Sequence, residues 1–111
     1  MFRIIALLAS GPGHPEGDVA QGIELTVPLT PQGQIEPAAA GAAVRRFWRD
    51  REDWTGALEM IDAGWALRST RSADEPLWEF DLRILRPGEY VSLRRPDGED
   101  AVFRIVSVEP V

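Results

Sequence analysis

Residues 86–108 read RPGEYVSLRRPDGEDAVFRIVSV, a turn, a strand, a second turn and a second strand. In residues 86–89, proline stands at the second position of a type II turn and glycine, which tolerates a positive φ, at the third. Residues 95–98 have similar turn-forming types, with Gly98 closing the turn before an apolar run. The stretch therefore predicts two short antiparallel strands, and it makes Gly88 and Gly98 structural residues.

Two earlier stretches alternate apolar and polar side chains, the pattern of a strand with one buried face. In LWEFDLRIL, residues 77–85, the apolar face is Trp78, Phe80, Leu82 and Ile84. In GIELTVPLT, residues 22–30, it is Ile23, Leu25, Val27 and Leu29. Proline cannot donate to a ladder, so Pro28 indicates an edge strand or a bulge. Both stretches are predicted to be strands along their whole length.

Further turn chemistry joins these strands into a meander. ALEMI and WALRS flank residues 62–64, which form a predicted three-residue hairpin loop with Gly64 available for positive φ. Residues 57–109 are therefore predicted to form a five-stranded antiparallel meander. Strands at 2–9 and 22–30 raise the total to seven, which favours a small barrel or sandwich, mainly β, with residues 1–111 as a single domain.

The segment EPAAAGAAVRRFWRDREDWTG is ambiguous. Pro37 at a first helical position and the alanines after it predict a short helix near 37–43, the only substantial helix in the chain. The residues that follow combine helical spacing of apolar side chains with the aromatic and β-branched types that strands prefer. Helix and strand therefore both stay open for residues 44–54.

Composition excludes several kinds of chemistry. The chain has no cysteine, so disulfides, thiolate metal sites and a cysteine nucleophile are excluded, and nothing indicates an oxidising compartment. The net charge of −6 opposes binding to nucleic acids and anionic lipids. No apolar run approaches the roughly 18 residues of a membrane span. We therefore expect a cytoplasmic, acidic protein that does not enter a membrane.

The loop SGPGHPEGD, residues 10–18, invites a nucleotide or metal interpretation. Its glycines do not have the spacing of a dinucleotide-binding turn, its prolines remove N–H donors, and its carboxylates repel phosphate. His14, Glu16 and Asp18 all have ligating side chains, but one imidazole in a loop makes an incomplete site. A solvated connection between strands explains this loop better, and we expect no metal site.

The stretch RRFWR, residues 45–49, places arginines beside aromatic rings, as many single-strand nucleic-acid surfaces do. Carboxylates follow at once and can neutralise Arg45, Arg46 and Arg49 by local ion pairs. Nucleic-acid binding is therefore disfavoured, and the rings of Phe47 and Trp48 are expected in the core or at a dimer contact.

No set of side chains forms a convincing catalytic group. The only histidine lacks a nucleophile motif beside it, and Glu79 and Asp81, on one strand face, have Arg83 next to them for ion pairing. The four tryptophans and Tyr90 supply large apolar area, for which core packing is the simplest role. In a closed barrel some of them could instead line a pocket for a small apolar or planar ligand.

Part of the chain, residues 87–107, resembles the flavin-binding barrel of the ferredoxin-reductase-like family. In that family a strand similar to Pro-Gly-Gln-Tyr-Val precedes Arg-x-Tyr-Ser, whose arginine, tyrosine and serine hold the flavin and its phosphate. Here PGEYV stands at 87–91 and RIVS at 104–107, with Val106 in place of the stacking tyrosine.

This resemblance implies a flavin site at Tyr90, Arg104 and Ser107. It covers about a fifth of the chain, and a proline-glycine turn before a strand is also common elsewhere. At full length, the order of the acidic glycine-rich loop, VPLTPQGQI, VRRFW and the C-terminal hairpin resembles small bacterial proteins of unknown function. That second resemblance implies one self-contained domain and no particular activity.

The leading functional hypothesis is a non-enzymatic binding or protein-interaction module, with no cofactor assigned. Its partner would be an unknown protein or a second copy, contacted through an edge strand or a tryptophan-rich patch. The alternative is a β-barrel that binds flavin or another small ligand. Nucleic-acid binding is the weakest of the three hypotheses.

Overall fold

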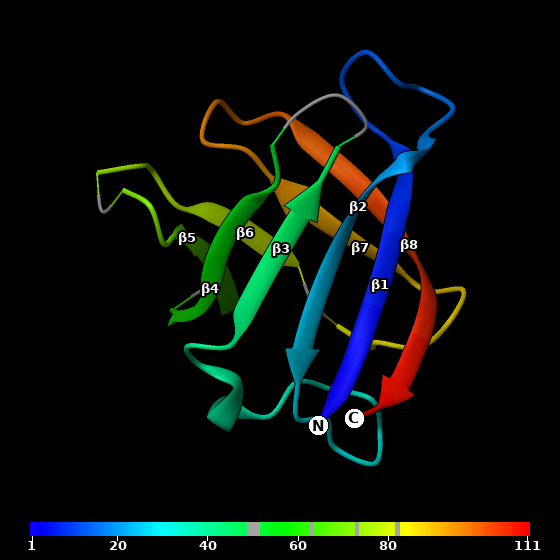
Figure 1. Ribbon diagram of the computed structural model, residues 1–111, viewed down its shortest axis with the longest axis vertical. Helices are drawn as coiled ribbons and strands as arrows, with labels where there is room; N and C mark the ends of the chain where they lie inside the picture. The colour runs from blue at the N-terminus through cyan, green and yellow to red at the C-terminus, as the bar shows by residue number, and fades with distance from the viewer. Residues whose placement is uncertain (49–51, 63, 73, 82) are drawn as a thin grey trace.

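Eight antiparallel strands close into a barrel in the computed structural model of the chain, which describes residues 1–48, 52–62, 64–72, 74–81 and 83–111 (Figure 1). The strands are β1 (Phe2–Ser10), β2 (Asp18–Val27), β3 (Ala43–Phe47), β4 (Trp54–Ile61), β5 (Gly64–Ser69), β6 (Trp78–Asp81), β7 (Tyr90–Arg94) and β8 (Asp100–Pro110). Each strand pairs with the next one along the chain. The predicted small antiparallel barrel, mainly β, is confirmed, with one strand more than the seven expected.

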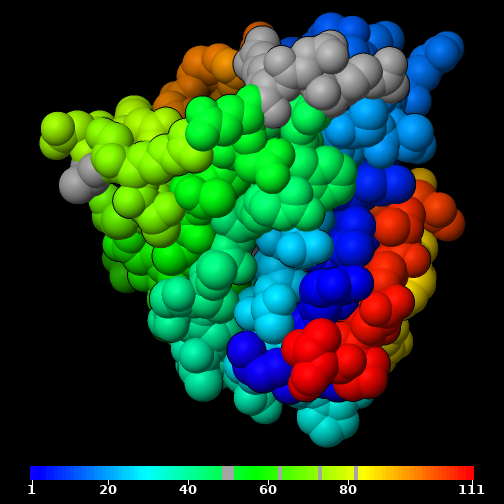
Figure 2. Space-filling model, viewed as in Figure 1, coloured from blue at the N-terminus to red at the C-terminus, as the bar shows by residue number. Residues whose placement is uncertain are grey.

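The first and last strands close the barrel. β1 pairs with β8 from Phe2 opposite Pro110 to Ser10 opposite Val102, with register shifts at two points along the ladder. Figure 2 shows these two strands, blue and red, in contact along one side of the molecule. Every strand therefore has two hydrogen-bonded neighbours, and the described chain leaves no free edge strand for the edge-to-edge dimer considered above.

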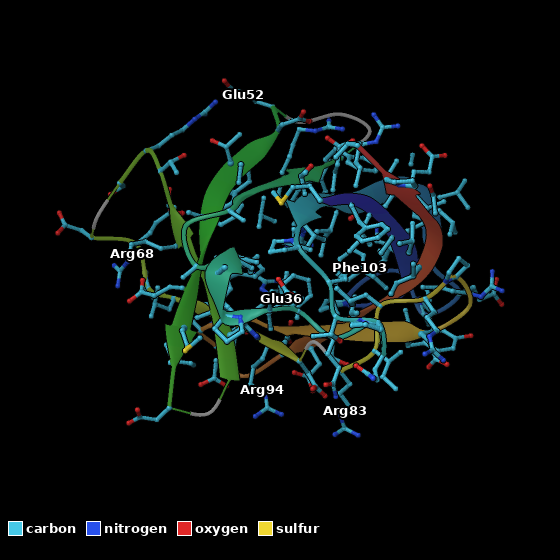
Figure 3. All side chains as sticks on the ribbon, turned by 90° about the horizontal axis from the view of Figure 1, so that it is seen from below. Glu36, Glu52, Arg68, Arg83, Arg94 and Phe103 are labelled. Carbon is cyan, nitrogen blue, oxygen red and sulfur yellow. The ribbon has the colours of Figure 1, made fainter. Side chains whose placement is uncertain are left out.

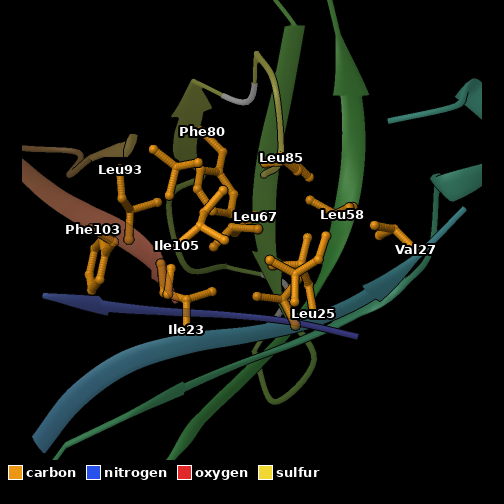
Figure 4. Packing of buried hydrophobic residues seen from close by; sticks show 14 of the residues in the cluster. Ile23, Leu25, Val27, Leu58, Leu67, Phe80, Leu85, Leu93, Phe103 and Ile105 are labelled. Atoms are coloured by element: carbon orange, nitrogen blue, oxygen red, sulfur yellow. The ribbon is translucent and has the colours of Figure 1, made fainter. Parts of the chain in front are cut away.

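Alternation along the strands fills the interior with apolar side chains, because successive residues point to opposite faces. In β8, Ala101, Phe103 and Ile105 are buried, whereas Arg104 between them is exposed. Figure 4 shows how side chains from neighbouring strands meet inside. The largest fully buried side chains are Phe103, Ile4, Ile23, Leu58, Leu67, Leu85, Leu93, Ile105, Val27 and Val44.

The lower end of the barrel in Figure 1 is closed by two connections rather than by strands. After β6 the chain crosses this end, and the backbone N–H of Leu85 donates to the carbonyl of Gly33 at 2.8 Å. Leu85 is 2% exposed, and Leu29 and Ile35 from the opposite connection pack against the same core. The apolar interior is therefore plugged below.

Both turns of the C-terminal hairpin region have the expected geometry. Gly88 has a φ of 93°, and the N–H of Glu89 donates to the carbonyl of Arg86 at 3.0 Å. Gly98 has a φ of 89°, and its N–H donates to the carbonyl of Arg95 at 2.9 Å. The five-stranded meander predicted for residues 57–109 is confirmed as β4 to β8.

The predicted helix at 37–43 is wrong. Only a single 3-10 turn forms, at Pro37–Ala39, and Gly41 follows with a φ of 89°. The N–H of Gly41 then donates to the carbonyl of Leu58 at 2.7 Å. Because this hydrogen bond joins the backbone to strand β4, the helix does not continue. β3 begins at Ala43 and supplies the eighth strand, in the segment whose conformation the sequence left open.

The other predicted elements hold over part of their length. Within residues 77–85 the strand covers only Trp78–Asp81, Leu82 lies outside the described residues, and Ile84 is 39% exposed because the chain has turned to bury Leu85. The β4–β5 hairpin forms where expected, but Gly64 already pairs with Ile61, so it belongs to β5 rather than to the loop.

The described residues contain no helix long and apolar enough to cross a membrane.

Candidate ligand-binding site

An arginine lies inside the barrel near its upper end, where β3 and β7 end and β4, β6 and β8 begin. Along β3, Val44 and Arg46 are buried while Arg45 between them is not, as the alternation of a strand requires. Arg46 is only 9% exposed. A buried guanidinium loses hydration, so this position is costly unless the surroundings stabilise the cation.

Aromatic rings surround this cation. The guanidinium carbon of Arg46 lies 4.5 Å from the ring centroid of Trp48, 5.0 Å from that of Trp78 and 5.7 Å from that of Phe103. All three distances are within the range of cation–π attraction, which is stronger when the cation is desolvated. The guanidinium of Arg95 lies on Trp78 as well, at 5.8 Å, and it also forms ion pairs with Asp97 at 3.7 Å and Glu99 at 3.8 Å.

A second polar group in the same cluster has an unused hydrogen-bonding capacity. The indole Nε1 of Trp54 is buried, and within the described part of the chain it has no hydrogen-bond partner. Its ring contacts that of Trp78, with centroids 6.4 Å apart. The free space among these side chains is about 10 Å³, no more than one water molecule needs. We call the cluster of Arg46, Trp48, Trp54 and Trp78 the arginine–tryptophan site.

The neighbouring arginine lies on the other side of the strand. Arg45 points outward, donates to Asp53 Oδ2 at 2.8 Å and lies 3.4 Å from Glu24 Oε2. The hydrogen bond to Asp53 raises the pKa of Arg45. The arginines proposed for nucleic acid thus do not share one face, and Arg49 lies outside the described residues.

The side chains of the arginine–tryptophan site have the chemistry of binding groups. Guanidinium and indole groups are not proton acceptors at neutral pH, so neither is a general base. Together they offer N–H donors, positive charge and flat apolar walls. These properties suit a small anion or a planar ligand.

The proposed flavin residues lie on the outer face of the barrel. Tyr90 and Arg104 are paired across β7 and β8, and both are exposed. Ser107 lies further along β8, opposite Ile5, and is half-buried. The structure brings the first two together and places the third beyond Val106, near a register shift in the β1–β8 ladder.

A larger hollow lies outside the barrel, between the β4–β5 hairpin and the outer face of β6 and β7. Its volume is about 550 Å³, with Ile61 and Trp65 among its lining residues. Figure 3, seen from below, shows Arg83 and Arg94 outside the ring of strands on this side and Phe103 inside it.

The charged residues of this hollow pair mainly with one another. Arg83 Nε lies 3.3 Å from Asp81 Oδ1, and Arg94 Nε lies 3.1 Å from Asp100 Oδ1. Glu79 lies opposite Arg94 across β6 and β7. The expected ion-paired, exposed face is therefore confirmed for Asp81, and most charge in the hollow is neutralised within the chain.

Hydrogen bonds between backbone groups stabilise the loop between β1 and β2. The N–H groups of Gly11 and Gly17 donate to the carbonyl of His14, at 3.1 and 3.0 Å. Asp18 accepts from the N–H of Ala20 at 3.0 Å. Among the described residues, no group of three or more acidic, histidine or cysteine side chains is arranged to hold a metal ion.

The expected core role of the tryptophans is confirmed for Trp54, Trp65 and Trp78, which pack against the buried cluster. For Phe47 the core position is wrong, because its ring lies on the outer face, where it covers Gly22 and stacks with Arg45 at 5.0 Å, and the alternative of a dimer contact stays a prediction. Sequence reasoning missed the inward position of Arg46. The signal was present as period-2 alternation of Val44, Arg46 and Trp48.

Comparisons with protein-family models, with curated proteins and with solved structures find no match to the chain.

Proposed function

We propose that this protein is a non-enzymatic binding module that takes a small ligand at the upper end of its barrel. The observation that carries the proposal is the arginine–tryptophan site. A buried indole N–H with no partner among the described residues is costly to the fold, and a ligand that accepts its hydrogen bond while lying against the Arg46 cation stabilises it. The plugged lower end directs ligand entry to the upper end.

The arginine–tryptophan site has too little free volume to bind an organic ligand without rearrangement. A space of about 10 Å³ does not admit an organic ligand, so at least one of the surrounding rings must move on binding. Side-chain rearrangement at a site is common when partners bind, even where the backbone stays in place. The rest of the barrel is filled by its own side chains, and this confines the ligand to the site itself.

Native mass spectrometry of the purified protein tests the proposal, since one spectrum reports both bound mass and subunit count. We expect a small bound mass, either retained from the cell or acquired from a metabolite extract. Arg46→Leu should lose this mass, whereas Arg45→Leu, which removes an outward arginine one residue away, should keep it. A bare chain before and after incubation with the extract would contradict ligand binding, and a dimer would then direct attention to self-association.

Flavin binding on the outer face is a second candidate, favoured by the cross-strand pairing of Tyr90 with Arg104. A flavin ring could lie on the exposed tyrosine while its phosphate pairs with the arginine. Ser107 would supply a further hydrogen bond, as the resemblance to flavin-binding barrels implies. Flavin mononucleotide added to the protein should then show quenched fluorescence that is restored in Arg104→Leu. Unchanged flavin fluorescence would remove this candidate.

We further propose the cytoplasm as the compartment, in keeping with a chain that contains no cysteine.

A further inference from the structure

Trp48 differs from the other rings described around Arg46. Trp54 and Trp78 begin strands β4 and β6 and pack against the core, and Phe103 is fully buried within β8. Trp48 follows the last residue of β3 and belongs to no strand. The direction of its side chain is therefore not fixed by a strand ladder, as it is for the other three residues.

The position that the Trp48 ring occupies suits a flat aromatic group. Of the three rings on the guanidinium, its ring is nearest, at 4.5 Å, and the space left beside it is about 10 Å³. A flat aromatic ligand of indole size would fit this position if the indole moved out, with no need for a larger cavity. Such a ligand would keep the cation–π contact that Trp48 now makes.

The edge of this position determines which substituent fits. Trp54 Nε1 is a buried donor for which the described residues supply no partner. The guanidinium groups of Arg46 and Arg95 both lie on the ring of Trp78, and Arg95 also forms long ion pairs with Asp97 and Glu99. A carboxylate fits both the unsatisfied donor and the nearby cations, because it accepts hydrogen bonds and carries a negative charge. A neutral ring without an acceptor would leave the Trp54 donor unsatisfied.

We propose that the ring of Trp48 occupies the ligand's position in the unbound protein. The ligand is a planar aromatic carboxylate whose ring replaces the indole of Trp48 on Arg46. Its carboxylate accepts the hydrogen bond of Trp54 Nε1. The inference rests on the proposed function and adds to it the ligand class and an internal competitor. Trp48 then sets the affinity, because the ligand must displace it.

Isothermal titration calorimetry with indole-3-carboxylate tests the inference at about 0.15 M salt, where long-range repulsion by the acidic chain is screened beyond about 8 Å. Trp48→Ala should bind this probe roughly tenfold more tightly than the wild type, the effect expected from removing one competing cation–π contact. Trp54→Phe, which keeps a ring but lacks the N–H, should bind roughly tenfold more weakly than the wild type.

Two neutral or non-aromatic probes and one variant serve as controls. Indole lacks the carboxylate and cyclohexanecarboxylate lacks the aromatic face, so both should bind at least about tenfold more weakly than indole-3-carboxylate. Phe47→Ala removes the adjacent ring on the outer face and should leave the affinity unchanged. If Trp48→Ala is not folded by circular dichroism, Trp48→Leu takes its place.

Equal affinity of the wild type and the Trp48 variant for indole-3-carboxylate would overturn the competitor role. Equal binding of the three probes would overturn the ligand class. If no probe binds but the native mass spectrum still shows a bound mass that depends on Arg46, the inference fails and the proposed function stands. If there is no such mass either, both fail.

Discussion

Gly56 and the indole of Trp54 are in such close contact that a Cβ at residue 56 would lie 2.3 Å from Cη2 of Trp54. The same Cβ would lie 2.6 Å from the carbonyl oxygen of Arg68, which belongs to the neighbouring strand β5. Real Cβ atoms do not approach other atoms this closely. The missing side chain of Gly56 therefore makes room for one wall of the arginine–tryptophan site.

We expect Gly56→Ala to lower the free energy of unfolding by about 1–3 kcal/mol, the usual cost of overpacking, because one of the two neighbours is backbone. Urea unfolding measures this loss. Gly11→Ala is the control, since its Cβ would lie 3.3 Å from the end of the Leu8 side chain and in ordinary van der Waals contact with Ala101, at 3.6 Å. Equal stability of the two variants would show that Trp54 does not occupy the space at residue 56.

Gly88→Val should destabilise the protein by about 1–3 kcal/mol through backbone strain alone. The φ of 93° disfavours a β-branched residue, while the nearest atom to a new Cβ, Arg104 Nη2, is 3.9 Å away and does not clash. Thermal unfolding measures the change. Gly88→Asn should cost less, because asparagine tolerates positive φ, and an unchanged melting temperature in the valine variant would contradict the turn.

Two adjacent residues test the plug at the lower end. Leu85→Ala should cost about 2–5 kcal/mol because it leaves a cavity in the core. Ile84→Ala should have a much smaller effect, because Ile84 is 39% exposed. Chemical denaturation of both variants measures the two losses in the free energy of unfolding. The reverse order would mean that the alternation of β6 continues past Asp81, as the sequence alone suggests.

The ion pair of Glu59 with Arg68 on the outer face predicts a pH dependence. A hydrogen bond from Arg68 lowers the pKa of Glu59 below its ordinary value of 4.5. A carboxyl group with a lowered pKa in the folded state stabilises the fold above its unfolded pKa, and this contribution is lost as the pH falls through the folded value. The pair is exposed, so the contribution to stability is small.

Carbon-detected NMR titration of the glutamate carboxyl groups measures this effect directly. In Arg68→Gln the pKa of Glu59 should rise towards its ordinary value. Glu52, whose pKa is lowered by its hydrogen bond with Arg71, is the internal control and should not change. A Glu59 pKa that is the same in both proteins would rule out the ion pair in solution.

The sequence predicts the barrel well where one face of a strand is buried. Ile23, Leu25 and Val27 are all inside, as their alternation indicates. Prediction from the sequence fails where the conformation of a segment depends on a residue that is distant in sequence but close in space. Gly41 bonds to Leu58 of β4, and Leu85 turns inward to reach Gly33, and neither partner is close in sequence.

For the candidate site, the sequence indicates tryptophans that could line a pocket but not the residue at its centre. The ambiguity of residues 44–54 hides Arg46, because its direction depends on whether β3 is a strand. Once β3 is paired with β2, Arg46 must follow Val44 to the inside. That the Trp54 donor has no partner in the described part of the chain depends on three-dimensional packing, and no sequence pattern indicates it.

Closure of the barrel through β1 and β8 also has a consequence for synthesis on the ribosome. Phe2 is made more than a hundred residues before its partner Pro110. Until then one side of β1 offers unpaired backbone groups to any other extended chain. The nascent protein is therefore exposed to misassembly until β8 has been made, and a chaperone that covers β1 would protect it most.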